Sequence, residues 1–367
     1  MPERTQMAHT ESPSAAKSRQ HATPRPSASI LLLSPTNQVL LLQRVSTSSS
    51  FSSAHVFPGG NLSEFHDGKV PPPDDVKRHE DSLPYRISAI RETFEESGIL
   101  LARDGSHRGA LLNLPVIERD KARQSIYESK ISFTDWLKTV GGVADTDNLI
   151  PFTRWITPPT QPKRFTTQMY IHMLPLATEN DTVIAAAQHD AMVPTPDNGN
   201  EVTTAHFDDA GTWIARAQKG EVLLYPPQFF LLHLLSRFLT GAPDAQLGPS
   251  ETREYYRAQR ERLRGFLDTV PTATEPQAAR HATAQIPWSQ KVISPVTLGI
   301  REQDQRAILG LHSPGSELKG SLKGGDWERV VLVKFGTGRV ANVEVRGRQE
   351  VLAEQRTAEK QESKSKL

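Results

Sequence analysis

The feature that most constrains this chain is the run Arg91-Glu-Thr-Phe-Glu-Glu-Ser-Gly98, in which three glutamates stand at positions i, i+3 and i+4. In an α-helix this spacing places Glu92, Glu95 and Glu96 on one arc of about 100°. Three carboxylates on one arc repel each other unless a positive group lies between them. A hard divalent cation is the usual partner, because Mg²⁺ binds carboxylate oxygens and keeps several waters.

The residues around the glutamates predict that this run is a helix anchored on a core. Apolar side chains recur at i, i+3 and i+7 on the opposite arc, at Ile87, Ile90 and Phe94. Pro84 suits a first helical turn, and Gly98 suits the left-handed position that ends a helix. We therefore expect a helix over residues 84–98 that presents acid on one side. The alternative is a solvated helix face whose acidic residues bind nothing.

Two segments together resemble the Nudix box: Phe57-Pro-Gly-Gly60 and, further along, Arg91 to Ile99. A Nudix box joins a glycine loop to a helix with an R-E-x-x-E-E-x-G run and has an early glutamate between the two. The resemblance implies that Arg91 and the three glutamates are the catalytic residues, with the glutamates binding divalent ions, Mg²⁺ or Mn²⁺. It also implies the α/β class and the Nudix fold, an α/β/α sandwich around a mixed sheet.

The chain departs from the box between the glycine and the arginine. Residues 61–90 separate the two, far more than the box normally has. The sixth residue after Gly60 is His66 in place of a glutamate, and either Glu64 or Asp67 could supply the missing carboxylate. The extra residues, about 61–83, are rich in proline and charge, so we expect them to form a surface loop inserted in the box.

A box split in this way resembles one branch of the family, the peroxisomal coenzyme A diphosphatases of the Nudix motif 19 type. The loop from His55 to Gly60, the segment Trp155-Ile-Thr-Pro158 and the segment from Arg164 to Tyr170 are similar to that branch. Leu40-Leu-Leu-Gln-Arg44 is similar to the start of the branch's coenzyme A signature, whose second arginine is absent from this chain. The resemblance covers roughly residues 26–240.

The resemblance also implies a reaction. A metal-dependent hydrolase of this branch cleaves the diphosphate of coenzyme A and acyl-coenzyme A to 3′,5′-ADP and (acyl)phosphopantetheine. Arg44, Gly59 and Gly60 would then bind the substrate, since glycines let a phosphate approach the backbone closely. Glu201 is our candidate for the general base on a later loop, and the alternative is that it is an exposed loop glutamate.

Two other functions remain open at this stage. The first is a Nudix hydrolase that acts on another nucleotide diphosphate, such as NADH, FAD or capped RNA, and the missing signature arginine keeps it open. The second is a non-catalytic module that binds a nucleotide or a protein, for which the lost early glutamate is the supporting feature. The presence of Arg91, Glu92, Glu95 and Glu96 together argues against the second.

The last three residues, Ser365-Lys366-Leu367, match a C-terminal peroxisomal address that an import receptor reads. They follow a charged segment, residues 354–364, which we expect to be exposed. The motif predicts that the protein is peroxisomal and that the import receptor is one of its partners.

Composition narrows the classes of function. The chain has no cysteine, which excludes disulfides, thiolate metal sites and cysteine nucleophiles. Its net charge of +1 gives no broad basic field for nucleic acid. The richest apolar stretch, residues 229–239, is too short for a membrane span and carries His233 and Arg237, so we expect a buried helix there and no span.

Patterning along the chain predicts five regions. They are a disordered tail (1–25), the Nudix domain (26–242), a charged helix and linker (243–285), a β-rich accessory region (286–353) and a charged tail (354–367). Strands are expected at 28–33, 39–44, 99–102, 150–176 and 201–207, and a hairpin at 329–346. Besides the helix at 84–98, helices are expected at 115–140, 213–219, 227–239 and 251–267.

Overall fold

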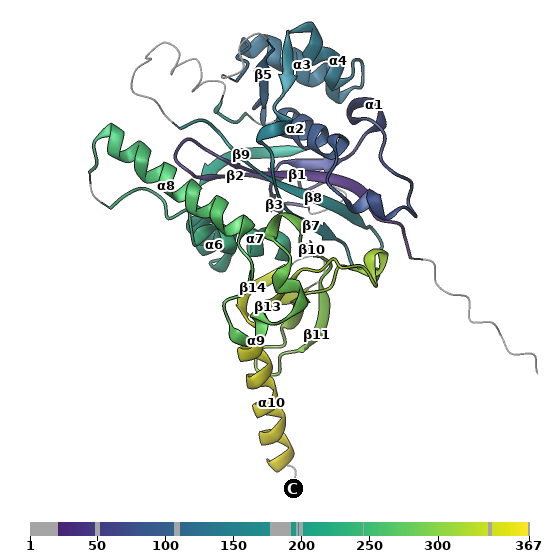
Figure 1. The fold of residues 1–367 in the computed structure, drawn as a ribbon, viewed down its shortest axis with the longest axis vertical. Coiled ribbons are helices and arrows are strands. Elements are labelled where there is room, and N and C mark those ends of the chain that lie inside the picture. The colour runs from purple at the N-terminus through teal and green to yellow at the C-terminus, as the bar shows by residue number, and fades with distance from the viewer. Residues whose placement is uncertain are drawn as a thin grey trace, which may run out of the picture.

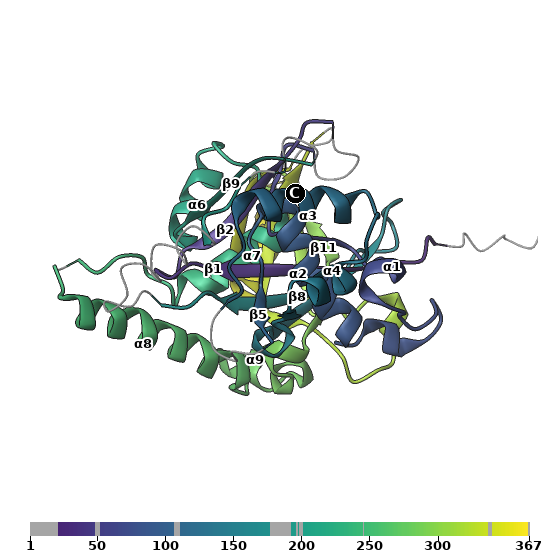
Figure 2. The same cartoon turned by 90° about the horizontal axis from the view of Figure 1, so that it is seen from above.

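A computed structural model of the chain describes residues 21–47, 52–105, 111–176, 192–195, 197, 201–244, 246–336 and 340–365, with side chains as far as 361. Most of the tail expected at 1–25 lies outside these residues, as do Lys366 and Leu367 and the side chain of Ser365. In Figure 1, a large body of sheet and helices carries a smaller β-rich part, from which one helix projects, and Figure 2 shows the molecule from above.

A mixed sheet lies at the centre of the large body. Within the described residues it contains eight strands, in the order β10-β7-β8-β1-β2-β3, with β4 paired to β1 and β9 to β2. Strand β1 runs parallel to β8 over its whole length, whereas β7 and β8 are antiparallel. The strands are β1 (Arg25–Leu33), β2 (Val39–Arg44), β3 (His55–Val56), β4 (Gly59–Asn61), β7 (Ile150–Ile156), β8 (Phe165–Met173), β9 (Val202–Asp208) and β10 (Val292–Ile293).

Helices cover both faces of this sheet, because successive strand side chains point to opposite sides. Ile30 and Leu32 of β1 join one buried cluster, which includes Phe94, while Leu31 and Leu33 join the other. On the Phe94 side lie α2 (Leu83–Ser97), α3 (Val116–Tyr127) and α4 (Phe133–Thr139). On the other side lie α6 (Ala210–Gln218), α7 (Pro226–Ser236) and α8 (Pro249–Asp268). The predicted α/β/α sandwich with a mixed sheet is confirmed.

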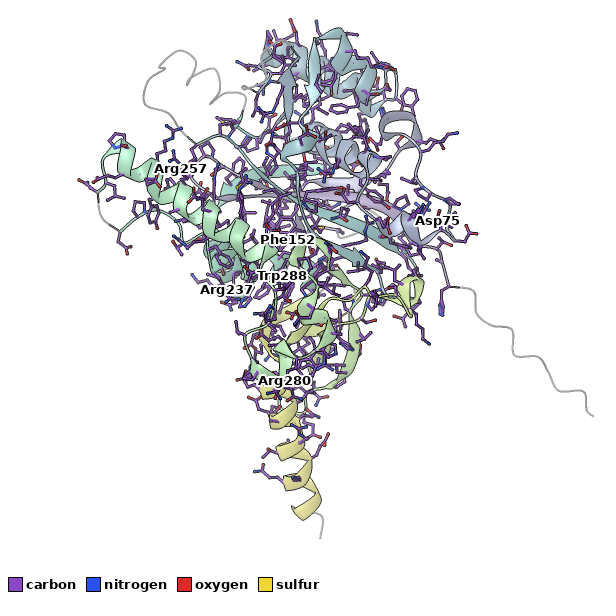
Figure 3. All side chains as sticks on the ribbon, viewed as in Figure 1. Asp75, Phe152, Arg237, Arg257, Arg280 and Trp288 are labelled. Atoms are coloured by element: carbon purple, nitrogen blue, oxygen red, sulfur yellow. The ribbon has the colours of Figure 1, made fainter. Side chains whose placement is uncertain are left out.

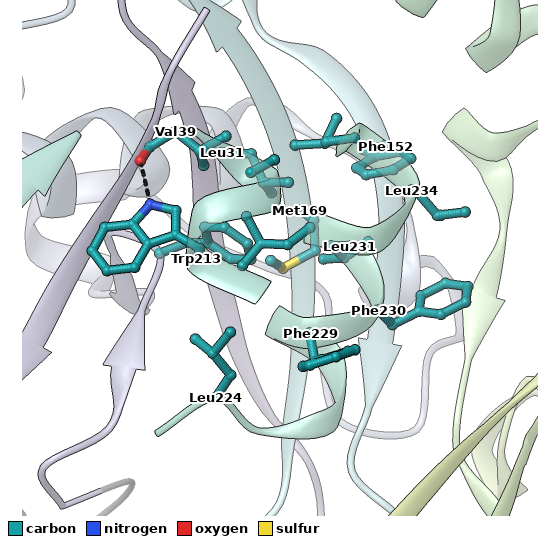
Figure 4. Close-up of a cluster of buried hydrophobic side chains, with 14 of the residues drawn as sticks. Leu31, Val39, Phe152, Met169, Trp213, Leu224, Phe229, Phe230, Leu231 and Leu234 are labelled. Carbon is teal, nitrogen blue, oxygen red and sulfur yellow. Dashed lines mark hydrogen bonds between the residues drawn. The ribbon is translucent and has the colours of Figure 1, made fainter. Parts of the chain in front are cut away.

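The buried cluster on the α6–α7 side shows how these helices pack on the central sheet. Trp213 of α6 is buried, and its indole nitrogen donates a hydrogen bond to the carbonyl oxygen of Val39 at 3.0 Å (Figure 4). Phe229, Phe230 and Leu231 of α7 fill the space beneath the sheet in the same view. The apolar stretch at 229–239 is therefore a buried helix of the core, as predicted. Within the described residues, no helix has the length and apolar character needed to cross a membrane.

Helix α2 follows its sequence signals closely. Pro84 stands in the first turn, and Gly98 ends the helix with a left-handed φ of 72°. The amide of Gly98 donates to the carbonyl of Phe94 at 2.9 Å, which satisfies one carbonyl of the last turn. The Phe94 ring stacks on Trp136 of α4, with ring centroids 5.1 Å apart. One face of the helix is thereby fixed on the core, and the other is left for the glutamates.

The C-terminal region has a sheet of its own but is also part of the large body. Strands β11 (Val296–Ile300), β12 (Ala307–Leu311), β13 (Asp326–Phe335) and β14 (Val340–Gly347) form an antiparallel sheet, with the predicted hairpin as β13 and β14. Strand β10 pairs in parallel with β7 of the central sheet. Trp288 lies beside Phe152 in the centre of the molecule (Figure 3), with ring centroids 6.1 Å apart.

The final helix, α10 (Arg348–Ser365), occupies most of the segment expected to be a charged tail. Val351 packs on the second sheet with Ile308 and Leu332. Arg346 of β14 forms an ion pair with Glu354 at 2.6 Å, which holds the first turns of the helix in place. Beyond those turns the helix projects away from the sheet in Figure 1.

Three local expectations were wrong. The helix expected at 115–140 is two helices, α3 and α4, separated by residues 128–132, where Ser129 takes a φ of 54° that a helix cannot contain. Residues 99–101 belong to no strand, and β5 (Ala102–Asp104) begins only afterwards, paired with β6 (Gly142–Ala144). The insert is not purely a surface loop, because it forms α1 (Glu64–Asp67) and the turn η1 (Val76–His79) and buries three polar residues: His66, Asp67 and His79.

Candidate active site

The glutamates of α2 face a turn formed by two glycines. The amide of Gly59 donates to Oε2 of Glu96 at 2.8 Å. Glu92 lies so close to Gly60 that a Cβ on that glycine would be 2.5 Å from the carboxyl carbon. Gly59 has a φ of 155°, and a Cβ there would meet the carbonyl oxygen of Ala28 at 2.3 Å. Position 59 therefore requires glycine, whereas a side chain at position 60 would displace the Glu92 carboxyl group.

Arg91 lies at the centre of the carboxylates. Its guanidinium Nη1 is 2.9 Å from Oε1 of Glu92 and 3.0 Å from Oε1 of Glu95. On its other edge, Nε and Nη2 donate to the two carboxylate oxygens of Asp67, each at 2.9 Å. This parallel pair of bonds is the strongest geometry available to an arginine and a carboxylate. The Arg91 side chain is 5% exposed and that of Asp67 is fully buried, so the pair is rigid.

The position of Asp67 answers the question that the split box raised. Glu64 is exposed and forms an ion pair with Lys69 at 3.5 Å. His66 points elsewhere, since its Nδ1 accepts from the amide of Phe133. Asp67 is the carboxylate that holds Arg91, and it is placed by the short helix α1, where it also accepts from the amide of Ser63 at 2.8 Å. Asp67 therefore belongs to the first part of the insert, where α1 places it against Arg91.

A second arginine closes the other end of the cluster. Arg44, at the end of β2, has Nη1 at 3.6 Å from Oε1 of Glu96 and Nη2 at 3.2 Å from Oε2 of Glu201. Glu201 thus lies in the same cluster as the helix glutamates, although 43% of its side chain is exposed. The amide of Glu201 donates to Asp197 at 2.7 Å, which fixes the start of β9. The structure therefore brings together Arg44, Gly59, Gly60 and Glu201 around the glutamates.

Sequence reasoning missed two residues that support this arrangement. Asp197 holds the backbone at Glu201, and the polar turn just before β9 was its only signal. Arg123 of α3 donates to the carbonyl oxygen of Glu95 at 2.8 Å, where a cation is favourable near the end of a helix. Arg123 lies on a helix that the sequence marks only by its apolar positions, so its role could not be read from spacing.

The carboxylates are desolvated beyond what the arginines compensate. Burial, together with the charges of Glu95, Asp67 and Glu201, raises the pKa of Glu92 to about 7 against the pull of Arg91. Burial and the Glu92 charge raise the pKa of Glu96 well above its usual range, and burial also raises the pKa of Glu95. Burial is the largest cause of each of these pKa shifts, and the charges of neighbouring carboxylates add to it.

The carboxylate oxygens of Glu92, Glu95 and Glu96 are suitable ligands for a divalent cation. Their side chains do not converge on a common ion position in this structure. Among the described residues, no group of three or more acidic or histidine side chains converges on a common ion position. The reason is visible in the contacts: Arg91 holds one oxygen each of Glu92 and Glu95, while the Gly59 amide holds one oxygen of Glu96. The remaining carboxylate oxygens are of the hard type that Mg²⁺ and Mn²⁺ bind.

Comparison with known proteins shows what this part of the chain is similar to. Residues 72–235 match a family model described as the NUDT19 Nudix domain. This part of the chain is similar to Nudix domains of the NUDT19 type. The matched span includes α2 with Arg91 and all three of its glutamates.

Relatives of the Nudix domain include two proteins named acyl-coenzyme A diphosphatase NUDT19. The one from Gallus gallus is 29% identical over 247 residues, covering 55% of this chain and 61% of that protein. The one from Xenopus laevis is 26% identical over 243 residues, covering 55% of this chain and 60% of that protein. The chain thus spans about three fifths of the length of these relatives. A crystal structure of a Nudix hydrolase from Alicyclobacillus acidocaldarius matches 57% of this chain and 90% of that one, at 22% identity and a TM-score of 0.44.

Proposed function

We propose that this protein is a metal-dependent diphosphate hydrolase that cleaves coenzyme A and acyl-coenzyme A to 3′,5′-ADP and (acyl)phosphopantetheine. The observation that carries the proposal is the cluster of buried carboxylates around Arg91, set against a glycine turn. The names of two relatives support this substrate, because both are called acyl-coenzyme A diphosphatase NUDT19.

Glu92, Glu95 and Glu96 would hold the cation, Mg²⁺ or Mn²⁺. A divalent cation held there supplies positive charge for the diphosphate and activates water for attack on phosphorus. The raised pKa values of the three glutamates support this assignment, since a cation among them would relieve their repulsion. Arg91 would stay in place when a cation binds, because the bonds from its Nε and Nη2 to Asp67 do not involve the three glutamates.

The other residues have separate tasks in this proposal. The Gly59–Gly60 turn has no side chains, so the substrate's diphosphate can approach its backbone closely. Arg44 lies between Glu96 and Glu201 and can place its guanidinium on a phosphate oxygen. Glu201 is the most exposed carboxylate of the cluster and can accept the proton of the attacking water. It would act as the general base.

The test is product analysis with purified protein. Free coenzyme A, an acyl-coenzyme A, NADH, FAD and ADP-ribose are incubated with Mg²⁺ or Mn²⁺, and products are identified by mass spectrometry. Glu95→Gln removes one charge from the cluster, and Glu64→Gln is the matched control on the exposed side of α1. We expect 3′,5′-ADP from the coenzyme A substrates with the wild type and Glu64→Gln, and at least a hundredfold less with Glu95→Gln.

One observation favours a second substrate class. Arg44, the residue that resembles the coenzyme A signature, faces the carboxylates, and the signature's second arginine is absent. A Nudix hydrolase acting on NADH, FAD or capped RNA would need no such pair of arginines. Cleavage of NADH or FAD without cleavage of coenzyme A would favour this class and exclude the first. Absence of cleavage on every substrate would favour a non-catalytic binding module.

Location in the peroxisome and recognition by the import receptor remain predictions from Ser365-Lys366-Leu367. A fluorescent protein fused in front of residues 348–367 tests them. Peroxisomal signal that disappears when Leu367 is replaced by Asp supports the address, and a diffuse signal from the unaltered fusion excludes it.

A further inference from the structure

A cluster of basic side chains surrounds a tryptophan on the second sheet, separate from the glutamates of α2. His281 precedes the turn at 282–285, Trp327 lies in β13, His312 follows β12, and Arg348 begins α10. The His281 and Trp327 rings stack with centroids 5.2 Å apart, and the Arg348 guanidinium carbon is 4.9 Å from the centre of the Trp327 ring. Arg348 Nη1 lies 3.0 Å from His312 Nδ1. Figure 3 labels Arg280, the residue before His281, and so shows where this cluster lies in the molecule.

The hydrogen bonds of this cluster decide which nitrogen of each imidazole carries the proton. A guanidinium can only donate, so His312 accepts from Arg348 through Nδ1 and carries its proton on Nε2. The backbone amide of Thr283 donates to Nδ1 of His281 at 3.3 Å, so His281 also carries its proton on Nε2. Both imidazoles therefore present an N–H donor even when they are neutral.

The acidic groups nearby are committed to other partners. Asp326 pairs with Arg329 at 3.0 Å, and Glu328 pairs with Arg329 at 2.6 Å. Glu328 also accepts from the amides of Thr274 and Glu275. Among the described residues, no carboxylate lies within ion-pair distance of Arg348. The cluster therefore offers donors and positive charge, which the charge of Asp326 offsets in part.

The electrostatics agree with this description. Burial lowers the pKa of His312, and the charge of Arg348 lowers it further. Burial and then the charges of Arg348 and Lys291 lower the pKa of His281. Lys291 itself is turned inward, donating to the carbonyl oxygens of Thr283 and Gly325 at 2.7 and 3.1 Å. Its charge therefore adds to the local positive potential without filling the donors at the surface.

We propose that His281, His312 and Arg348 form a binding site for a phosphoryl group. Their donors come from three different elements, which suits the three terminal oxygens of a phosphate better than the two of a carboxylate. Guanidinium groups favour phosphate oxygens for their charge and geometry, and Arg348 supplies such a group here. The site lies on the second sheet and does not depend on the function proposed for the glutamate cluster.

Isothermal titration with inorganic phosphate, in chelator and without divalent cations, tests the site on the full-length protein. We expect binding in the millimolar range or tighter with the wild type. Arg348→Gln should weaken it by at least tenfold. Arg356→Gln removes the same charge from an exposed position further along α10 and should change it by less than twofold. Glu95→Gln should bind phosphate like the wild type, since it belongs to the other cluster.

A second variant and a second ligand complete the test. His312→Gln keeps Arg348 but changes one donor, and it should weaken phosphate binding by about threefold or more, whether or not Arg348→Gln folds. Titration with 3′,5′-ADP distinguishes a nucleotide phosphate from a free one: tighter binding than inorganic phosphate, lost in Arg348→Gln, supports the nucleotide. Equal binding supports free phosphate. Absence of phosphate binding to the wild type, or equal loss in Arg348→Gln and Arg356→Gln, overturns the proposal.

Discussion

Asp67 and Arg91 are joined by two parallel hydrogen bonds of 2.9 Å each, in surroundings where neither side chain is more than 5% exposed. The bonds join residues that are 24 positions apart, across the insert in the box. Asp67 thereby holds the arginine that holds Glu92 and Glu95. The geometry of the carboxylate cluster depends on a residue outside its helix.

Removal of Asp67 should therefore affect both stability and activity. In Asp67→Ala the Arg91 guanidinium stays buried with one edge unpaired, so the free energy of unfolding should fall by about 3 kcal/mol. Urea denaturation of the variant measures this. Glu64→Ala, on the same short helix but exposed, should change it by less than about 0.5 kcal/mol. Equal effects of the two variants would contradict the assignment of Asp67.

Replacing each glycine of the turn by alanine should have a different effect, on activity at Gly60 and on stability at Gly59. In Gly60→Ala the new Cβ meets only the carboxyl group of Glu92, so we expect a folded protein whose hydrolase activity falls at least tenfold. In Gly59→Ala the Cβ meets backbone at Ala28, at a φ that L-residues rarely adopt, so the fold itself should be destabilised. Thermal melts and activity measured together separate the two outcomes. Restored activity in a Gly60→Ala, Glu92→Asp double variant would show that the effect passes through Glu92.

Arg44 should compete with a cation for Glu96 and Glu201. Its guanidinium nitrogens lie 3.6 Å from Glu96 and 3.2 Å from Glu201, longer than the 2.9 Å bonds between Arg91 and Asp67. Arg44→Gln should therefore increase the affinity for Mn²⁺ several-fold, because a competing positive charge is removed. Titration calorimetry with Mn²⁺ alone measures this without substrate. Weaker Mn²⁺ binding in the variant would mean that Arg44 organises the carboxylates instead of competing for them.

The part of the site that could be predicted is the part whose determinants are local. Pro84, Gly98 and the spacing of the glutamates all act within one helix, and the structure has that helix at 83–97. Asp67 could not be separated from Glu64 by sequence, because the choice depends on the direction in which α1 points after it packs beside α2. Arg123 acts through the backbone of a distant helix, which leaves no pattern in its own neighbourhood, whereas Asp197 binds amides four and five residues further on.

The same distinction explains the errors in the fold. The apolar positions of residues 115–140 fit a helix on either side of Ser129, but its left-handed backbone interrupts them and turns α4 onto Phe94. The strand β10 is only two residues long, and its parallel pairing with β7 joins residues more than 130 positions apart. Neither feature has a period or a turn signal that a single sequence reveals.

His79 should make stability depend on pH. It is buried in the insert, where Nδ1 meets Thr166 Oγ1 at 2.9 Å, and burial with the charge of Arg154 lowers its pKa to about 4. The unfolded chain takes up the proton below about pH 6.5 and the folded chain only near pH 4, so stability is lost as the pH falls through that window. His79→Gln should reduce the slope of unfolding free energy against pH by at most about 1.4 kcal/mol per pH unit. An unchanged slope in urea denaturations between pH 4 and 7 would exclude this role.

Substitution of Trp288 should show whether the C-terminal region unfolds together with the central sheet and its helices. Its ring is fully buried against Phe152 of β7, Phe230 of α7 and Phe266 of α8, although the residue lies just before β10 in the C-terminal region. Trp288→Ala should lower the free energy of unfolding by about 3–5 kcal/mol. It should also lower the melting temperature of the whole chain in a single transition, because the cavity opens in the shared core. Two separate transitions in calorimetry, with only one of them shifted, would instead show that the second sheet unfolds independently.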